Sequence, residues 1–209
     1  MVVIRLFLLS LVILVSPTSS FAAPINVNSD FSAGLTGWSA SGDVAVNSGV
    51  SVISDPNGGG TLLQSTNTGP GSFTLTFDLL NALSPKGNPG FSQGVFADIA
   101  AGTLYFSNSA LNLGNLAGNS TTTLFDANSA GVVSLLQVTG LGGGWFQYSL
   151  AFTTAFNYVT PVFDLFDQDF VTNSTLNIDN VKIEAAPIPE PATLLLLAGA
   201  LPIIRRRLS

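Results

Sequence analysis

The feature that most constrains the fold of this chain is an alternation of apolar and polar residues with period two. In residues 72–79, SFTLTFDL, the phenylalanines and leucines occupy every second position. Successive side chains of a β-strand point to opposite faces, so this segment predicts a strand with one buried face. Helical spacing is absent from it.

A second segment, residues 145–152 with the sequence WFQYSLAF, shows the same period. It places Phe146, Tyr148, Leu150 and Phe152 on one predicted buried face and Trp145 on the opposite face. Further strands are predicted at residues 44–46, 50–54, 61–65, 95–106, 132–138, 158–166 and 175–183. Clusters of Gly, Pro, Asn and Asp at residues 41–43, 55–60 and 85–90 predict turns.

These strands predict an all-β fold, an antiparallel β-sandwich of the jelly-roll type with about eight to ten strands. Glu and Lys, which cover the solvent face of helical bundles, are nearly missing from the chain. The chain is rich in Gly, Ser and Asn, which is also a mark of disorder. Its 46% hydrophobic and 10% aromatic residues argue instead for a packed core.

Charge and composition exclude several classes of function. Residues 23–186 contain two lysines against eleven acidic residues, a net charge of −9, so a basic surface for nucleic acid cannot be assembled. The chain has no cysteine, which excludes disulfides and thiol catalysis, and no histidine, which removes the usual general base and zinc ligand.

Residues 1–22 have the organisation of a secretory signal peptide. Arg5 precedes an apolar run, and the following small residues, which end in Ser20-Phe21-Ala22, suit cleavage by a signal peptidase. The alternative is an uncleaved anchor, for which the apolar run is short. We therefore divide the chain into a signal peptide at 1–22, a β-sandwich domain at 23–186 and a C-terminal segment at 187–209.

The C-terminal segment combines an apolar run with a cluster of cations. Residues 192–204 are apolar and would extend about 20 Å as a helix, which is short against a membrane core of about 30 Å. Arg205, Arg206 and Arg207 follow directly and make up half of the Lys and Arg of the chain. Cations beside an apolar segment hold the cytoplasmic side of a membrane, so the run predicts a membrane stop. The alternative is a final strand or helix with a frayed basic end.

Pro189, Glu190 and Pro191, the leucine-rich run and the three arginines together resemble the PEP-CTERM sorting domain of Gram-negative bacteria. The apolar run is shorter than in that family and contains Pro202. The resemblance implies export, transient anchoring in the inner membrane by a short transmembrane helix, and cleavage near Pro189–Pro191 by an exosortase. It also implies an association with exopolysaccharide and biofilms.

Two further segments resemble the first and last strands of galactose-binding-like jelly rolls, the scaffold of many carbohydrate-binding modules. They are residues 26–38, with an N-x-x-F motif at 28–31 followed by Trp38, and residues 176–183, with the motif I-D-N-V at 178–181. The separation of the two segments matches a whole domain of that kind.

The second of these segments contains a break in the alternation. Leu176 and Ile178 have one parity, whereas Val181 and Ile183 have the other, so a bulge is predicted at Asp179 and the residue after it. In the modules that the segment resembles, an aspartate at this place ligates a structural calcium ion, which implies Asp30 and Asp179 as ligands. The alternative is that Asp179 hydrogen-bonds local backbone.

Carbohydrate binding also needs aromatic side chains that stack on sugar rings. The candidates for this contact are Trp38, Trp145, Tyr105 and Tyr158, and each can instead pack in the core or at an edge. Core packing is favoured for Trp38, which follows a turn at the start of the domain, and Trp145, opposite the buried face of its strand, is the better candidate.

Three acidic residues, Asp164, Asp167 and Asp169, are close together in the sequence and suggest a glycoside hydrolase, which uses paired carboxyl groups about 5 to 9.5 Å apart. Such acids at the end of a strand are usually solvated or ligate an ion instead.

The function that the sequence predicts is that of an exported, non-enzymatic component of the cell surface or extracellular matrix. A calcium-stabilised carbohydrate-binding module is the alternative, and a glycoside hydrolase is the third hypothesis.

Overall fold

Two antiparallel sheets contain all the strands of this chain that a computed structural model describes, over residues 23–56, 58–82, 99–126, 131–132, 136–166 and 174–186. These residues contain no helix. They belong to one compact unit, Ala22–Ile188, whereas the other unit, Met1–Phe21 with Pro189–Ser209, lies outside them. The predicted all-β antiparallel sandwich is therefore confirmed.

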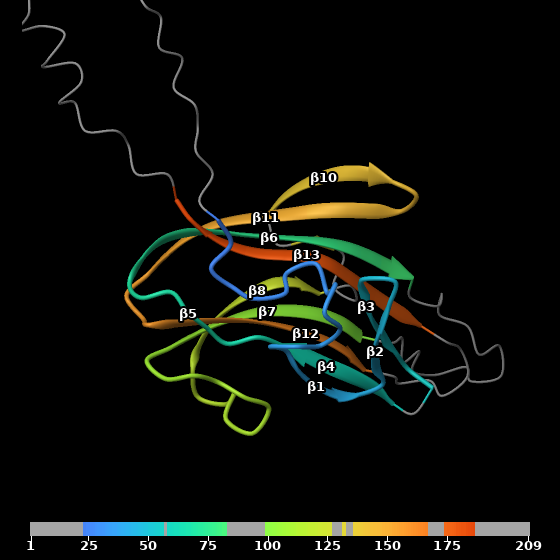
Figure 1. Ribbon diagram of the computed structural model, residues 1–209, viewed down its shortest axis with the longest axis horizontal. Coiled ribbons are helices and arrows are strands. Elements are labelled where there is room, and N and C mark those ends of the chain that lie inside the picture. Colours follow the sequence, from blue (N-terminus) through green and yellow to red (C-terminus); the bar gives the residue numbers. More distant parts are fainter. Residues whose placement is uncertain are drawn as a thin grey trace, which may run out of the picture. The chain divides into compact units, whose positions relative to one another are not determined.

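Sheet A has seven strands and forms the lower layer in Figure 1. Its order is β1 (Ser39–Gly42), β4 (Gly59–Leu63), β12 (Tyr158–Phe166), β7 (Ile99–Ser107), β8 (Ser120–Asp126) and β9 (Gly131–Val132), with β5 (Thr66–Asn67) also paired to β12.

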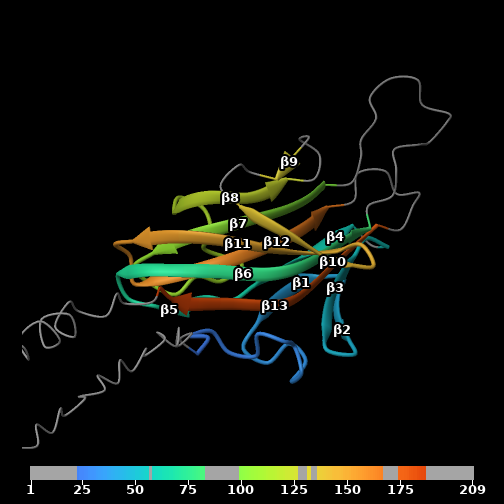
Figure 2. The same cartoon turned by 90° about the horizontal axis from the view of Figure 1, so that it is seen from above.

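Sheet B has six strands and forms the opposite layer, as Figure 2 shows from above. Its order is β10 (Gln137–Gly142), β11 (Trp145–Thr154), β6 (Gly71–Ala82), β13 (Thr175–Ala185), β3 (Val50–Ser54) and β2 (Val44–Asn47). The chain passes between the sheets repeatedly, for example from β3 to β4 and from β11 to β12, as a jelly roll requires.

The core lies between the sheets and is built by the alternation that the sequence shows. On β6 the phenylalanines and leucines of residues 73–79 are all buried. Phe77 stacks on Tyr148 of β11, with ring centroids 5.2 Å apart, and meets Phe163 of β12 edge-on at 5.2 Å. Each such side chain contributes about 1.5–3 kcal/mol to stability through burial. The contact between Phe77 of sheet B and Phe163 of sheet A joins the two layers.

Most predicted strands are present, with differences where the sequence pattern is weak. The prediction missed β1 and β8, because SASG has no large apolar residue and STTTLFD is polar over its first half. The predicted strand at 132–138 corresponds to β9 and the start of β10. Phe146 was expected on the buried face, but its side chain is 44% exposed at the end of the β10–β11 hairpin.

The predicted bulge is confirmed. The register between β13 and β6 shifts between Asp179 and Lys182, and Asn180 has a φ of 49°. As a result Ile178, Val181 and Ile183 all point into the core, although their sequence parities differ.

Beyond the bulge, β3 no longer pairs with β13, and the N-terminal segment takes its place. We call residues 25–30 the strap. The Asn26 amide nitrogen donates to the carbonyl of Val181 at 2.7 Å, and its oxygen accepts from the Ile183 N–H at 2.8 Å. The Val181 N–H donates to the carbonyl of Ser29 at 2.9 Å. The strap thus satisfies the edge of β13 that would otherwise be unpaired.

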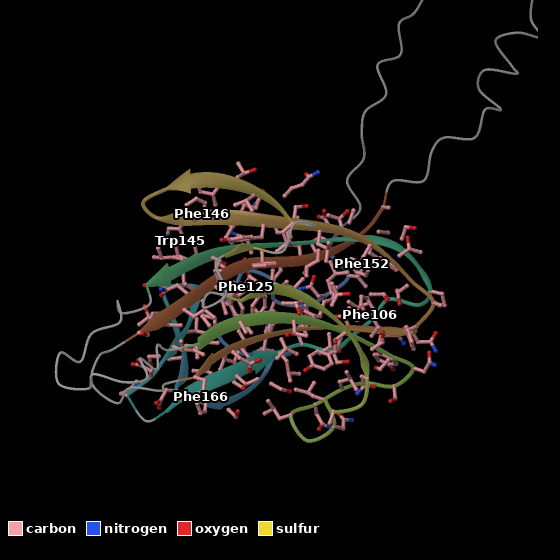
Figure 3. The ribbon with its side chains drawn as sticks, turned by 180° about the vertical axis from the view of Figure 1, so that it is seen from behind. Phe106, Phe125, Trp145, Phe146, Phe152 and Phe166 are labelled. Atoms are coloured by element: carbon pink, nitrogen blue, oxygen red, sulfur yellow. The ribbon has the colours of Figure 1, made fainter. Side chains whose placement is uncertain are left out.

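Both ends of the described domain lie at one end of the sandwich. The Ile25 N–H donates to Ile183, and the Ala186 N–H donates to Ser72. Strand β12 begins near this end, after the turn from β11, and ends at Phe166 on the opposite side, which we call the distal end. Figure 3 shows Phe166, Trp145 and Phe146 at the distal end.

Candidate functional site

The candidate site lies on the outer face of sheet A at the distal end. The alternation of β12 buries Phe163 and Leu165 in the core and turns Asp164 and Phe166 outward. Asp164 pairs in register with Thr61 of β4 on one side and with Ala101 of β7 on the other. The chain therefore places one carboxylate and one aromatic ring on the same face of a strand.

Close packing of glycines forms the floor of the site. A Cβ on Gly59 would lie 2.0 Å from the carbonyl oxygen of Leu165, and a Cβ on Gly42 would lie 2.2 Å from the carbonyl oxygen of Gly59. Both glycines have positive φ, 89° and 72°. Only glycine permits this approach of β1, β4 and β12, so the floor carries few side chains.

A pocket of about 350 Å³ opens above this floor. This volume is at the lower end of the range of ligand sites, about 300–1,000 Å³, and suits a small ligand or one or two units of a polymer. The lining residues are Ser41, Gly42, Gly58, Gly59, Gly60, Thr61, Asp164, Leu165 and Phe166.

The carboxylate in this pocket is half-buried. Burial raises the pKa of Asp164, and a hydrogen bond with the Thr61 hydroxyl acts in the opposite direction. Phe166 is 58% exposed, and Phe166 and Val27 have the highest exposed fraction among the large apolar side chains of the described residues. A desolvated acceptor beside an exposed aromatic ring is suited to a ligand that has both an apolar face and hydrogen-bond donors.

Trp145 is not part of this pocket. It begins β11 in sheet B, where the register turns it to the outer face, and its side chain is half-buried. Figure 3 shows Trp145 and Phe146 in the layer of β11 and Phe166 in the layer of β12. The contact of Trp145 with carbohydrate stays a prediction, and it concerns the outer face of sheet B.

Trp38 lies in the core. Its side chain is 8% exposed, its ring centroid lies 4.9 Å from that of Phe31, and its indole nitrogen donates to the carbonyl of Asn28 at 3.1 Å. This is the core packing that the sequence favoured for Trp38, and it removes Trp38 from the solvent-facing platforms for a sugar ring.

The two predicted calcium ligands lie on either side of the bulge. Asp30, in the strap, accepts the backbone N–H and the hydroxyl of Ser32, and these hydrogen bonds lower its pKa. Asp179 accepts the N–H of Asn180 at 2.7 Å. Burial raises the pKa of Asp179, and the negative charges of Asp78 and Asp30 act in the same direction.

Asp78 is the third carboxylate of this region and stands opposite Asp179 in the register. It is 7% exposed, and its two oxygens accept amide hydrogens from Gln147 at 3.0 Å and from Asn180 at 2.9 Å. Calcium takes six to eight oxygens. Within the described ranges no group of three or more acidic side chains is placed to hold a metal ion, so these residues alone do not fit a calcium shell. Calcium at Asp30 and Asp179 stays a prediction.

Several predicted residues lie outside the described ranges. They are Asp167, Asp169, the motif Pro189, Glu190 and Pro191, and the arginines Arg205, Arg206 and Arg207. In the part of the chain that the structure describes, no helix has the length and apolar character needed to cross a membrane.

Sequence reasoning missed Phe166 and the glycine floor. The alternation FDLF at 163–166 already placed Asp164 and Phe166 on one face opposite two apolar residues. The glycines at 58–60 were predicted only as a turn, because their proximity to β12 is a long-range contact.

Comparisons with known proteins place this chain in no family. No family model matches it, and neither does any curated protein. Solved structures resemble it at low identity. One of them is the structure of TmCBM61 in complex with β-1,4-galactotriose, at 12% identity and a TM-score of 0.48. This match covers 79% of this chain and 100% of that chain. Another is a cleaved adhesin domain of Lys-gingipain from Porphyromonas gingivalis (18% identity, TM-score 0.42, 75% and 97%).

A third similar structure is the enzymatically active domain of tailspike protein 4 of bacteriophage CBA120 (12% identity, TM-score 0.46). The match covers 78% of this chain and 21% of the tailspike chain. At these identities and TM-scores none of the similar structures assigns a ligand or a binding residue to this chain.

Proposed function

We propose that this chain is an exported, non-enzymatic component of the cell surface or matrix whose β-sandwich binds carbohydrate in the pocket of Asp164 and Phe166. The observation that carries the proposal is the pairing of a half-buried carboxylate with an exposed aromatic ring over a glycine floor. Sugar rings have apolar faces and a rim of hydroxyl donors, and this pair of groups matches both.

The position of the pocket supports the proposal. The described domain begins and ends at the side opposite the distal end, where Ile25 and Ala186 bond to neighbouring strands. The pocket therefore lies at the other end of the described domain from Ile25 and Ala186.

Export and sorting rest on the sequence alone. The leader at 1–22, the Pro189–Pro191 motif and the three terminal arginines support processing by signal peptidase and exosortase and a transient stay in the inner membrane. Fusing residues 187–209 to an unrelated exported reporter tests this step. We expect the reporter in the membrane with its tail and outside the cell without it; a soluble, uncut reporter in a host with an exosortase contradicts the sorting proposal.

Binding is tested by affinity electrophoresis of the purified protein in gels that contain neutral or charged polysaccharides. We expect at least one polysaccharide to retard the protein and Phe166→Ala to weaken its binding about tenfold, equivalent to about 1.4 kcal/mol. Phe146→Ala is the matched control, because Phe146 is also exposed at the distal end but lies in sheet B.

Two outcomes contradict this assignment. If no polysaccharide retards the protein, the proposed function fails. If Trp145→Ala abolishes binding and Phe166→Ala leaves it unchanged, the ligand lies on the outer face of sheet B instead.

The hydrolase hypothesis has one observation in its favour, which is the raised pKa of Asp164. A general acid in glycoside hydrolysis has this property, but the reaction also needs a second carboxylate. Asp164 is the one carboxylate among the described residues that line the pocket. Release of reducing ends from any polysaccharide of the panel, lost in Asp164→Asn, would favour a hydrolase over a binding module.

A further inference from the structure

We propose that the pocket prefers a sugar unit that bears a protonated amino group over the N-acetylated or hydroxylated unit of the same shape. This inference rests on the proposed carbohydrate function and names the ligand class of the same site.

The first argument is the distribution of charge. Lys182 is the only cation among the residues that the structure describes, and it follows the bulge of β13 in sheet B. The pocket is in sheet A, and among its described lining residues Asp164 is the one ionisable side chain. A ligand with carboxylate or sulfate groups would meet this acid with no basic side chain among the described lining residues, whereas a cationic ligand is attracted.

The second argument is the remaining hydrogen-bonding capacity of Asp164. An ionised carboxylate offers about four acceptor sites, and the described hydrogen bond from Thr61 uses one. A bound ligand removes water from the others. An ammonium group supplies three donors and a compensating charge at once, which a hydroxyl does not.

The third argument is the spacing of Asp164 and Phe166. The two residues are two positions apart on one face of β12, which places them about 7 Å apart along the strand. An ammonium group between them contacts the carboxylate and lies within about 6 Å of the ring, where cation–π attraction acts. Acetylation of the amine removes the charge and two donors, so both contacts weaken.

The titration of Asp164 supports this preference. The strands that flank β12 place Thr61 and Ala101 opposite Asp164, and neither is charged. Burial raises the pKa of the carboxyl, and a neighbouring ammonium group favours its ionised form. Affinity for an amino sugar should therefore fall as the pH decreases through the pKa of Asp164.

The test compares three β-1,4-linked oligosaccharides of equal length, made of glucosamine, N-acetylglucosamine or glucose. Each is titrated into the purified protein by calorimetry at about pH 6, where amines are protonated. We expect the glucosamine oligomer to bind at least tenfold more tightly than the other two. Asp164→Asn should remove this difference. Glu184→Gln removes one carboxylate from β13 of sheet B and should preserve it.

Four outcomes overturn the inference. The first is equal or tighter binding of a neutral oligomer, which leaves the proposed carbohydrate function intact. The second is an equal loss in Glu184→Gln and Asp164→Asn, which shows general attraction to an acidic protein. The third is equal binding of oligolysine, which shows that the amine alone is recognised. The fourth is no binding of any oligomer or polysaccharide, and this result alone also removes the proposed function.

Discussion

Asp164 and Asp179 are both half-buried aspartates on the outer faces of sheets, and burial raises the pKa of each, but their surroundings differ. Asp179 lies in a bulge where Asn180 bonds to it and to its neighbour Asp78, and where the strap bonds to the edge of β13. Asp164 has one hydrogen-bonding side chain, Thr61, and opens into a pocket.

The difference shows how a structural carboxylate is told from one available to a ligand. At the bulge, amide donors from β11 and β13 bond to the oxygens of Asp78 and Asp179, so the acids help to fix the register of the strands. In the pocket, the one hydrogen bond described for Asp164 is that with Thr61, so acceptor positions remain for a ligand. Neither burial nor the number of hydrogen bonds distinguishes Asp164 from Asp179, since each accepts one described bond; the pocket beside Asp164 and the carboxylate of Asp78 beside Asp179 do.

The largest effect that we predict tests the floor of the pocket. Gly59→Ala should lower the free energy of unfolding by about 3 kcal/mol or more, because the new Cβ would meet the Leu165 carbonyl oxygen at 2.0 Å. Gly58→Ala is the matched control. Its φ is 112° and its Cβ has open space, so the loss should be about 1–2 kcal/mol. Equal losses in urea unfolding would show that the close approach of β4 and β12 is absent.

The next effect tests the strap at the bulge. Asn26→Ala leaves the carbonyl of Val181 and the N–H of Ile183 without their side-chain partners, and should cost about 3 kcal/mol in the free energy of unfolding. Asn47→Ala, on the exposed end of β2, should change the value by less than about 0.5 kcal/mol. A loss below about 0.5 kcal/mol in Asn26→Ala contradicts the structural role that we assign to this region.

The contrast between the two regions also explains what could be predicted from sequence. The bulge was predictable, because a change of parity between Ile178 and Val181 is a local signal that only an extra residue resolves. The sandwich was predictable for the same reason, since the alternation on β6 and β11 sets which face is buried. Strand β1 was missed because its sequence, SASG, has no apolar alternation of its own, and the strand forms by pairing with the glycine-rich β4.

The pocket was less predictable than the bulge. Asp164 was singled out as one of three neighbouring acids, but its neighbours in space are Thr61 and the glycines of β4, about a hundred residues earlier in the chain. A pocket depends on such long-range pairing. Likewise, the sequence left the role of Trp38 open, and its contacts with Phe31 and Asn28 decide it.

A smaller effect concerns pH. The folded-state pKa values of Asp164 and Asp179 are raised above the ordinary aspartate value of about 3.9. In the pH window between the ordinary and the raised pKa, these two groups therefore bind more protons in the folded chain than in the unfolded chain. The contribution of these two groups to the free energy of unfolding is therefore expected to fall as the pH rises through this window. Asp164→Asn and Asp179→Asn should each weaken this fall of the unfolding free energy as the pH rises above the ordinary aspartate pKa of about 3.9. A steeper dependence in either variant contradicts the sign, and only Asp164→Asn should alter binding.

The smallest effect separates calcium from hydrogen bonds at the bulge. Asp78 accepts from Gln147 and Asn180, Asp179 accepts the Asn180 N–H, and Asp30 accepts from Ser32. Because these carboxylates have protein donors, we expect a chelator to leave the melting temperature unchanged. A bound structural ion stabilises the folded state by mass action, and its removal would lower the melting temperature by several degrees. Such a fall, reversed by added calcium and absent in Asp179→Asn, would establish Asp30 and Asp179 as ligands. It would also end the contrast with Asp164, because both carboxylates would then be available to a ligand.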